Sequence, residues 1–148
     1  LPGVLGAAVA ADHVTIEVIA DGIHVHPASI ALLFAAAPGR IALVTDAIAA
    51  AAAAPGRYLL GDLDVDVADG RAVVAGTDTL AGSTLTPDRA LRIAVNDCDI
   101  SLHDAVAALT ATPARAIGEQ DPAVLAPGAR AELVVLDGGL FVTEVFVG

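Results

Sequence analysis

The sequence predicts an α/β fold with parallel strands, and two observations support this prediction. The first is a pair of apolar, strand-like runs, at residues 14–20 and 41–44, each ending in polar residues. The second is the segment between them, which has the apolar spacing of a helix. A strand, a helix and a strand at this spacing form a βαβ unit, in which the two strands run parallel through a right-handed crossover.

The helix between the two strands is expected to begin at Pro27, because proline suits the first helical position. A Pro-Gly pair at 38–39 is expected to end it. Its apolar side chains recur at the spacing i, i+3, i+4 and i+7, which gives one buried face: Ile30, Leu33, Phe34 and Ala37.

An antiparallel insertion is expected at about 57–75, where the apolar period changes to two. Short strands are predicted at 58–60, 63–67 and 71–74. Asp-Gly between alternating residues, as at 69–70, is typical of a hairpin turn. The alanine-rich stretch before the insertion, 49–54, fits either a frayed helix or a mobile loop.

Three helix starts follow the insertion. Thr86-Pro87 begins the first, and Ser101 with Asp104 resembles a capping box at the second. Thr112-Pro113 begins the third, which is expected to end at Gly118. The second helix is expected to bury an apolar stripe: Leu102, Ala105, Val106 and Leu109.

The last two strands are expected at 131–136 and 141–147, around a turn that contains glycines. A domain boundary is expected near 119–122. Residues 1–118 and 119–148 would then belong to different domains.

Composition excludes several classes of partner and compartment. The net charge is −11 without a basic cluster, which argues against nucleic acid and anionic membranes as partners. The single cysteine, Cys98, excludes an internal disulfide, is expected to be buried, and fits a reducing, cytoplasmic compartment. The chain has no methionine and begins with Leu1, so we expect a piece of a longer protein.

Candidate catalytic residues follow the two parallel strands. Asp21, His24 and His26 come after the first strand, and Asp46 comes after the second. The carboxyl ends of adjacent parallel strands lie about 5 Å apart, at the edge where ligands bind in α/β folds. A carboxylate beside imidazoles suits general acid–base catalysis or metal binding. The histidines alone would also fit surface or helix-capping positions.

The sequence resembles the N-acetylglucosamine-6-phosphate deacetylases of the amidohydrolase superfamily. The resemblance rests on Ala-Asp-Gly-Ile-His at 20–24, Leu-Val-Thr-Asp-Ala at 43–47 and Thr-Leu-Ala-Gly-Ser at 79–83. Two further segments, 110–118 and 125–137, resemble motifs of the wider superfamily. The resemblance implies the C-terminal portion of a (β/α)8 TIM barrel, with its last two strands, followed by strands of a small β-sandwich domain.

In that family, the position of Asp46 is the catalytic carboxylate. The resemblance implies that it takes a proton from a metal-bound water and gives it to the departing amine. It also implies a set of residues that hold the substrate: Asp21, Gly22, Ile23, His24, Leu80, Ala81 and Gly82.

The resemblance also implies components that this chain does not supply. A divalent metal, zinc or iron, would be held by a glutamate and two histidines from earlier strands, and an arginine before Leu1 would bind the sugar phosphate. The chain alone is therefore expected to be inactive, and the full-length enzyme is expected to be a homo-oligomer acting on an amino-sugar phosphate.

Three alternatives remain open at this point. One is another amidohydrolase, such as a dihydroorotase-like or D-aminoacylase-like enzyme, which should lack the strings at 20–24 and 79–83. Another is a deacetylase for the galactosamine isomer. The third is a non-catalytic β-rich binding module, which predicts no convergence of carboxylates at the strand ends.

Overall fold

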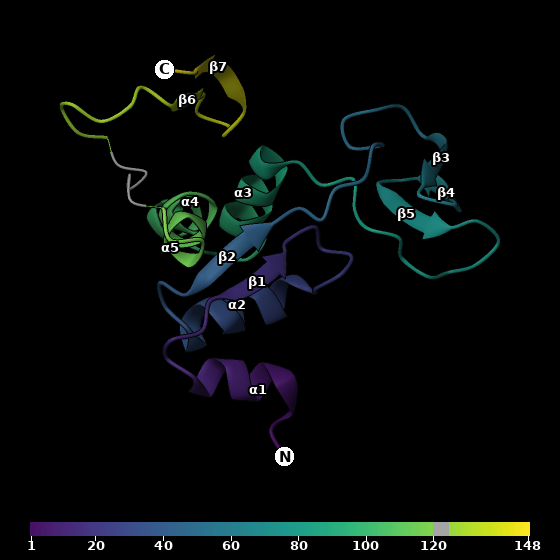
Figure 1. Cartoon of the computed structure of the whole chain (residues 1–148), viewed down its shortest axis with the longest axis horizontal. Helices are drawn as coiled ribbons and strands as arrows, with labels where there is room; N and C mark the ends of the chain where they lie inside the picture. The colour runs from purple at the N-terminus through teal and green to yellow at the C-terminus, as the bar shows by residue number, and fades with distance from the viewer. Residues whose placement is uncertain (120–124) are drawn as a thin grey trace.

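The computed structural model describes residues 1–119 and 125–148. At its centre, β1 (Ile16–Ile19) and β2 (Ile41–Val44) run parallel, and α2 (Pro27–Ala36) connects them (Figure 1). Ile19 pairs with Val44 at the end of the two strands. The predicted βαβ unit is therefore confirmed.

The helix α2 begins where the sequence predicts. Pro27 is its first residue, and the Nδ1 atom of His26 accepts a hydrogen bond of 3.1 Å from the backbone N–H of Ala28. His26 is thus an N-cap, which satisfies a backbone donor that the helix leaves free. Ile30 and Leu33 are buried against the strands.

An N-terminal helix, α1 (Gly3–Ala10), was not expected from the sequence. None of its residues is buried. The guanidinium of Arg40 donates hydrogen bonds of 2.7–3.2 Å to four carbonyl oxygens at and beyond its C-terminal end: those of Ala8, Val9, Ala11 and Val14. A cation at the C-terminus of a helix is favourable, so Arg40, just before β2, ties α1 to the core.

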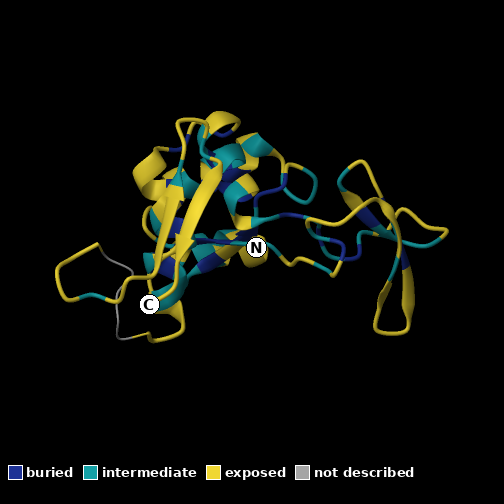
Figure 2. Cartoon of the chain, turned by 90° about the horizontal axis from the view of Figure 1, so that it is seen from above, coloured by how far each residue is buried: buried dark blue, intermediate teal, exposed yellow. Residues whose placement is uncertain are grey.

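Three antiparallel strands form an arm that projects from the parallel pair (Figures 1 and 2). They are β3 (Gly56–Leu60), β4 (Leu63–Ala68) and β5 (Arg71–Val74). The arm has its own small core, separate from the main cluster: Ala50, Val65, Val67, Ala72 and Ala81. Residues 49–54 form successive turns, so a helix there was wrong.

Helices α3 (Pro87–Asn96), α4 (Leu102–Leu109) and α5 (Ala111–Ala116) cover β2. The Ser101 hydroxyl accepts from the backbone N–H of Asp104 at 3.1 Å and donates to its carboxylate, which confirms the predicted cap of α4.

The expected apolar stripe of α4 was partly wrong. Leu102 is 47% exposed and Val106 is 38% exposed, whereas Ala105 and Ala108 are buried. The small alanine side chains face the core because they let α4 approach its neighbours closely. The larger residues are left at the surface.

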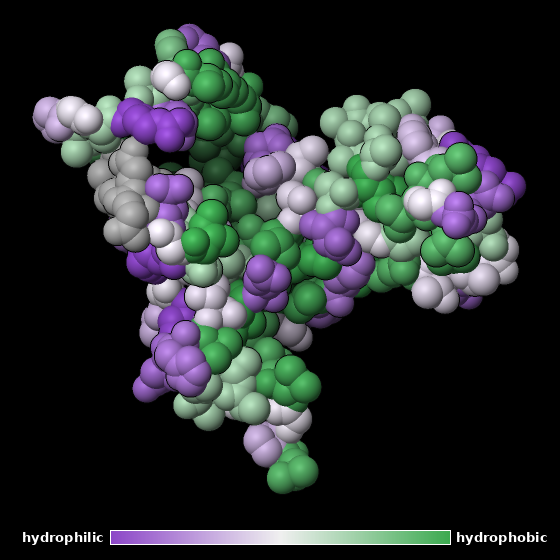
Figure 3. Space-filling model, in the orientation of Figure 1, coloured by the Kyte–Doolittle hydropathy of each residue, from purple (hydrophilic) through white to green (hydrophobic). Residues whose placement is uncertain are grey.

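The chain ends in an antiparallel ribbon of β6 (Leu133–Leu136) and β7 (Val142–Phe146). Arg92 of α3 lies 4.2 Å from the centre of the Phe141 ring and donates to the carbonyl of Leu140, which joins the ribbon to the core. Its apolar side chains are largely exposed, as the surface over the ribbon shows (Figure 3).

The expected β-sandwich is not seen as such, since residues 125–148 contribute one ribbon. The expected boundary near 119–122 falls largely outside the described residues. Within the described part of the chain, no helix is long and apolar enough to cross a membrane.

Candidate active site

The parallel register brings the two candidate carboxylates to one edge of the sheet. Ile19 and Val44 are partners, and Asp21 and Asp46 each follow two residues later. Because the strands are parallel neighbours, both turns leave from the carboxyl end of the pair. The two aspartates nevertheless differ in every contact they make.

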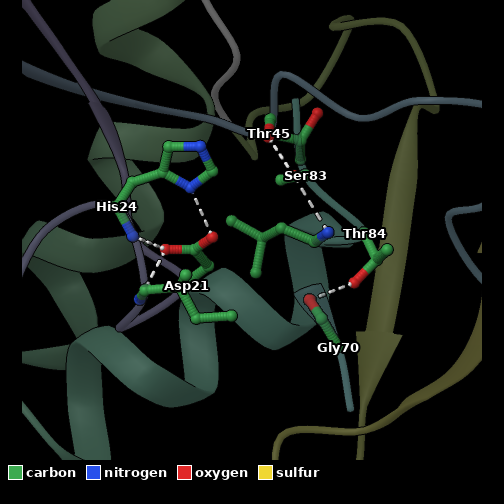
Figure 4. A network of polar contacts seen from close by, with 8 residues as sticks. Asp21, His24, Thr45, Gly70, Ser83 and Thr84 are labelled. Carbon is green, nitrogen blue, oxygen red and sulfur yellow. Dashed lines mark hydrogen bonds and ion pairs between the residues drawn. The ribbon is translucent and has the colours of Figure 1, made fainter. Parts of the chain in front are cut away.

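The turn after β1 is held by Asp21 (Figure 4). Its Oδ1 accepts hydrogen bonds from the backbone N–H groups of Ile23 and His24, each of 2.8 Å, and its Oδ2 lies 2.7 Å from Nδ1 of His24. Asp21 is only 8% exposed. Burial raises the pKa of its carboxyl, but the hydrogen bonds from His24 and Ile23 outweigh burial and lower that pKa.

The turn after β2 leaves Asp46 open. Its side chain is exposed, and within the described residues no hydrogen bond or ion pair reaches its carboxylate. Its φ angle is 46°, in the left-handed region that aspartate tolerates better than most residues. Its backbone carbonyl accepts a 2.8 Å hydrogen bond from the N–H of Ser83. The main chain of Asp46 is fixed while its carboxylate is free.

The loop at 79–83 is attached directly to this turn. Ala47 and Ser83 form an isolated parallel bridge just beyond the end of β2. Ser83 is 2% exposed, and its hydroxyl donates to the carbonyl of Thr45 and accepts from the N–H of Leu85 at 3.0 Å. Thr84 next to it donates to the carbonyl of Gly70 in the arm, as Figure 4 also shows.

Gly82 lies against Asp46 and cannot carry a side chain without strain. Its φ is +69°, and a Cβ atom there would be 2.7 Å from Cγ2 of Ile48 and 2.9 Å from the carbonyl oxygen of Asp46. The same point is 3.8 Å from Oδ2 of Asp46. The glycine therefore lets the loop pass beside the free carboxylate.

Leu80 and Ala81, the other two loop residues predicted to hold the substrate, are bonded to the arm. Leu80 forms a bridge with Val73, and the N–H of Ala81 donates to the carbonyl of Ala72 at 3.0 Å. The structure thus brings the loop to Asp46 through Gly82 and anchors its other end on β5.

Ser83 is the residue that the sequence interpretation missed at this site. It belongs to the string at 79–83 but received no role of its own. The available signal was a small hydroxyl residue between a loop glycine and an apolar position. Such a residue often hydrogen-bonds to nearby backbone.

A cavity of about 380 Å³ opens beside the Asp21 turn. It lies between that turn and the C-terminal half of α3, and its lining is mainly polar: Asp21, Gly22, Arg89, Arg92, Ile93, Asn96 and Asp97. A second cavity, of about 450 Å³, includes Gly39, Ile41 and Cys98 and so lies toward the amino end of β2, away from the candidate site.

Cys98 is buried as expected, and burial together with the charge of Asp97 raises the pKa of its thiol. A thiol with a raised pKa is a weak nucleophile at neutral pH. Its role here is to fill space in the core.

Metal ligands are not gathered within the described residues. No group of three or more His, Cys, Asp or Glu side chains there could hold an ion. Asp46 and His24 could supply at most two donors, whereas structural and catalytic metal sites use three or four protein ligands. The described residues do not by themselves fit a bound metal.

Comparison with known proteins finds one family model and several deacetylases similar to this chain. The model of the amidohydrolase family matches residues 4–148. N-acetyl-D-glucosamine-6-phosphate deacetylase from Mycobacterium smegmatis, solved as an aspartate-to-alanine mutant in complex with N-acetyl-D-glucosamine-6-phosphate, is 45% identical, with a TM-score of 0.87. The deacetylase from Thermotoga maritima is 34% identical, with a TM-score of 0.90.

The matches cover nearly all of this chain but only part of each relative. They cover 95% and 98% of this chain but only 38% and 40% of the solved chains. N-acetylgalactosamine-6-phosphate deacetylase from Escherichia coli O157:H7 is 39% identical over 147 residues, which are 99% of this chain and 39% of that protein. A relative from E. coli K12 with the same identity is shorter, and the match covers 87% of it.

This chain therefore spans about two fifths of most of these relatives. Over that span, the match of the family model and the similarity of fold to the solved deacetylases point to the same family. The chain belongs to the amidohydrolase family.

Proposed function

We propose that this chain supplies part of the active site of a deacetylase that hydrolyses the acetamide of N-acetylglucosamine 6-phosphate to glucosamine 6-phosphate and acetate. The observation that carries the proposal is the free carboxylate of Asp46 at the carboxyl end of β2, beside the glycine of the loop at 79–83. Three relatives described above, whose names are deacetylases of N-acetylated amino-sugar phosphates, support the choice of substrate class.

Asp46 is the proton carrier in this proposal. It takes a proton from the water that attacks the acetamide carbonyl and gives it to the amine that leaves. A carboxylate in this role must reach both groups, and the exposure of Asp46 and its lack of other partners within the described residues permit this. Its fixed backbone, bonded to Ser83, would hold the carboxylate in one position during both transfers.

The neighbouring residues hold the substrate in this proposal. The turn Asp21-Gly22-Ile23 presents His24 at the end of β1, one strand away from Asp46. The backbone of Leu80, Ala81 and Gly82 would line the pocket for the acetamido group and the sugar. The absence of a side chain at Gly82 would let the backbone of the loop lie close beside the carboxylate.

Other components of the enzyme are proposed to come from outside this chain. A zinc or iron ion would supply Lewis-acid polarisation of the carbonyl when bound. Its ligands would come from other parts of the enzyme, since the described residues do not form a metal site. We also propose that further strands complete a TIM barrel and a β-sandwich in the full enzyme. The same proposal makes the enzyme a homo-oligomer in the cytoplasm.

The galactosamine isomer is a second candidate substrate. The relative from E. coli O157:H7 favours it, because that protein is an N-acetylgalactosamine-6-phosphate deacetylase by name and is 39% identical to this chain. The two isomers differ at one hydroxyl. Direct comparison of the two substrates is therefore part of the test.

The test is a chimera in which this chain replaces the matching 38% of the M. smegmatis deacetylase. We expect acetate release from N-acetylglucosamine 6-phosphate, faster than from the galactosamine isomer, and none from dihydroorotate or an N-acetyl-D-amino acid. A faster galactosamine reaction would establish the second candidate. A folded, metal-loaded chimera that releases acetate from neither sugar would refute the proposal.

A further inference from the structure

We infer that Asp21 is a positioning residue, which holds the proton of the neutral His24 ring on Nδ1 and turns Nε2 toward the ligand. This inference rests on the proposed role of His24 in holding the substrate. In this inference Asp21 contacts the ring of His24 and does not contact the sugar itself.

The turn engages both carboxylate oxygens of Asp21 in its own hydrogen bonds. Its Oδ1 already receives two backbone N–H groups at 2.8 Å, and its Oδ2 receives the ring of His24 at 2.7 Å. The Asp21 side chain is 6% exposed and that of His24 is 19% exposed. The imidazole is the part of the pair that reaches the surface.

The carboxylate of Asp21 decides which nitrogen of His24 carries the proton. An ionised carboxylate can only accept, so Nδ1 of His24 must carry the hydrogen. The lowered pKa of Asp21 agrees with an ionised carboxylate. In the neutral imidazole, Nε2 then has a lone pair and no proton.

The position of Nε2 completes the argument. Figure 4 shows the second ring nitrogen on the edge of His24 that faces away from Asp21. Among the described residues, no buried side-chain nitrogen or oxygen lacks a hydrogen-bond partner. Nε2 has no hydrogen-bond partner among the described residues, and because it is not one of the buried unpartnered atoms it is accessible to a ligand.

This assignment restricts the chemistry of His24. A neutral imidazole with Nδ1 bound to Asp21 can accept from a hydroxyl but cannot donate to a carbonyl. Donation from Nε2 requires the imidazolium. Nε2 of the neutral ring therefore takes a donor from the ligand, whereas an acceptor such as the phosphate requires the protonated ring.

The experiment is a long-range ¹H–¹⁵N correlation spectrum of this chain labelled with ¹⁵N-histidine, recorded above the pH range in which histidine titrates. We expect a protonated Nδ1 and an unprotonated Nε2 for His24. In Asp21→Asn, the amide oxygen should stay with the two backbone donors, which turns the NH₂ group toward the ring. His24 should then switch to the Nε2–H tautomer.

The matched control is Asp97→Asn, which removes a carboxylate that lines the same cavity but does not contact the ring. It should leave the Nδ1–H tautomer unchanged. An Nε2–H tautomer in the unmodified chain would overturn the inference, and so would an Asp21→Asn variant that keeps Nδ1–H. If Asp21→Asn does not fold, the spectrum of the unmodified chain still decides.

An activity measurement separates this inference from the proposed function. In the chimera, Asp21→Asn should lower kcat/KM by about 10- to 100-fold, as loss of a group that orients a functional histidine does elsewhere. Asp97→Asn should not change it, and equal loss in both variants would count against a specific role for Asp21. An inactive chimera would refute the proposed function and leave the tautomer result standing.

Discussion

Asp21 and Asp46 occupy equivalent positions, two residues beyond the ends of paired parallel strands, yet their surroundings are opposite. Asp21 is buried, and both of its oxygens are bound within its own turn. Asp46 is exposed, and within the described residues its carboxylate is unbound. The comparison teaches that the environment after the strand, more than the position itself, decides whether a carboxylate is engaged within its own turn or left free.

The largest expected effect comes from removing the free carboxylate. Asp46→Asn in the chimera should lower kcat by about 10²- to 10⁴-fold while KM changes little, because a carboxamide cannot carry the proton. Steady-state kinetics with N-acetylglucosamine 6-phosphate measures both constants. Asp62→Asn, at an exposed turn of the arm, is the control and should behave like the unmodified chimera. An unchanged kcat in Asp46→Asn would contradict the proposed role of Asp46 as the proton carrier.

A smaller effect is expected from crowding the turn that holds Asp46. Gly82→Ala places a Cβ 2.7 Å from Ile48 and 2.9 Å from the Asp46 carbonyl, at a φ of +69°. We expect it to lower the free energy of unfolding by about 2–4 kcal/mol, from backbone strain and overpacking together. Chemical denaturation of this chain measures the change.

Gly76→Ala is the matched control for that substitution. Gly76 has a φ of +76°, but nothing lies within 4 Å of the added Cβ. It should cost about 1 kcal/mol from the backbone alone. If the two variants lose equal stability, the loop at 79–83 is not packed against Asp46 as described.

The smallest effect is a pH dependence of stability that comes from Asp21. Its pKa is lower in the folded chain than in the unfolded chain, so the unfolded state binds more protons in acid. The stability that it contributes should be complete above the unfolded pKa of about 3.9 and decline as the pH falls through the folded pKa.

Urea denaturation between neutral and acid pH checks this prediction. The stability difference between the unmodified chain and Asp21→Asn should shrink as the pH falls below about 4. Asp12→Asn, which removes an exposed carboxylate, is the control for the loss of one negative charge. A difference for Asp21→Asn that does not change with pH would mean that the buried turn does not favour the ionised carboxylate.

The parallel pair and its polar strand ends were predictable from the sequence because they depend on local patterns. Apolar runs followed by Asp and His identify a strand end, and Pro27 identifies a helix start. The cap at Ser101 and Asp104 was equally local. These features need only a few neighbouring residues.

Other features depend on contacts that a local pattern does not contain. The helix α1 is apolar on all sides and shows no helical period, and the hydrogen bonds that hold it come from Arg40, about thirty residues away. The difference between Asp21 and Asp46 likewise depends on the conformation of two short turns. The attachment of Ser83 to Thr45 spans the whole arm.

The central claim is that Asp46 and His24 serve one substrate from two neighbouring strands. A crystal structure of the Asp46→Asn chimera with N-acetylglucosamine 6-phosphate tests it directly. We predict intact substrate with the side chain of residue 46 at the acetamide and Nε2 of His24 within hydrogen-bond distance of the substrate. A bound substrate that contacts only one of these two side chains would contradict the account.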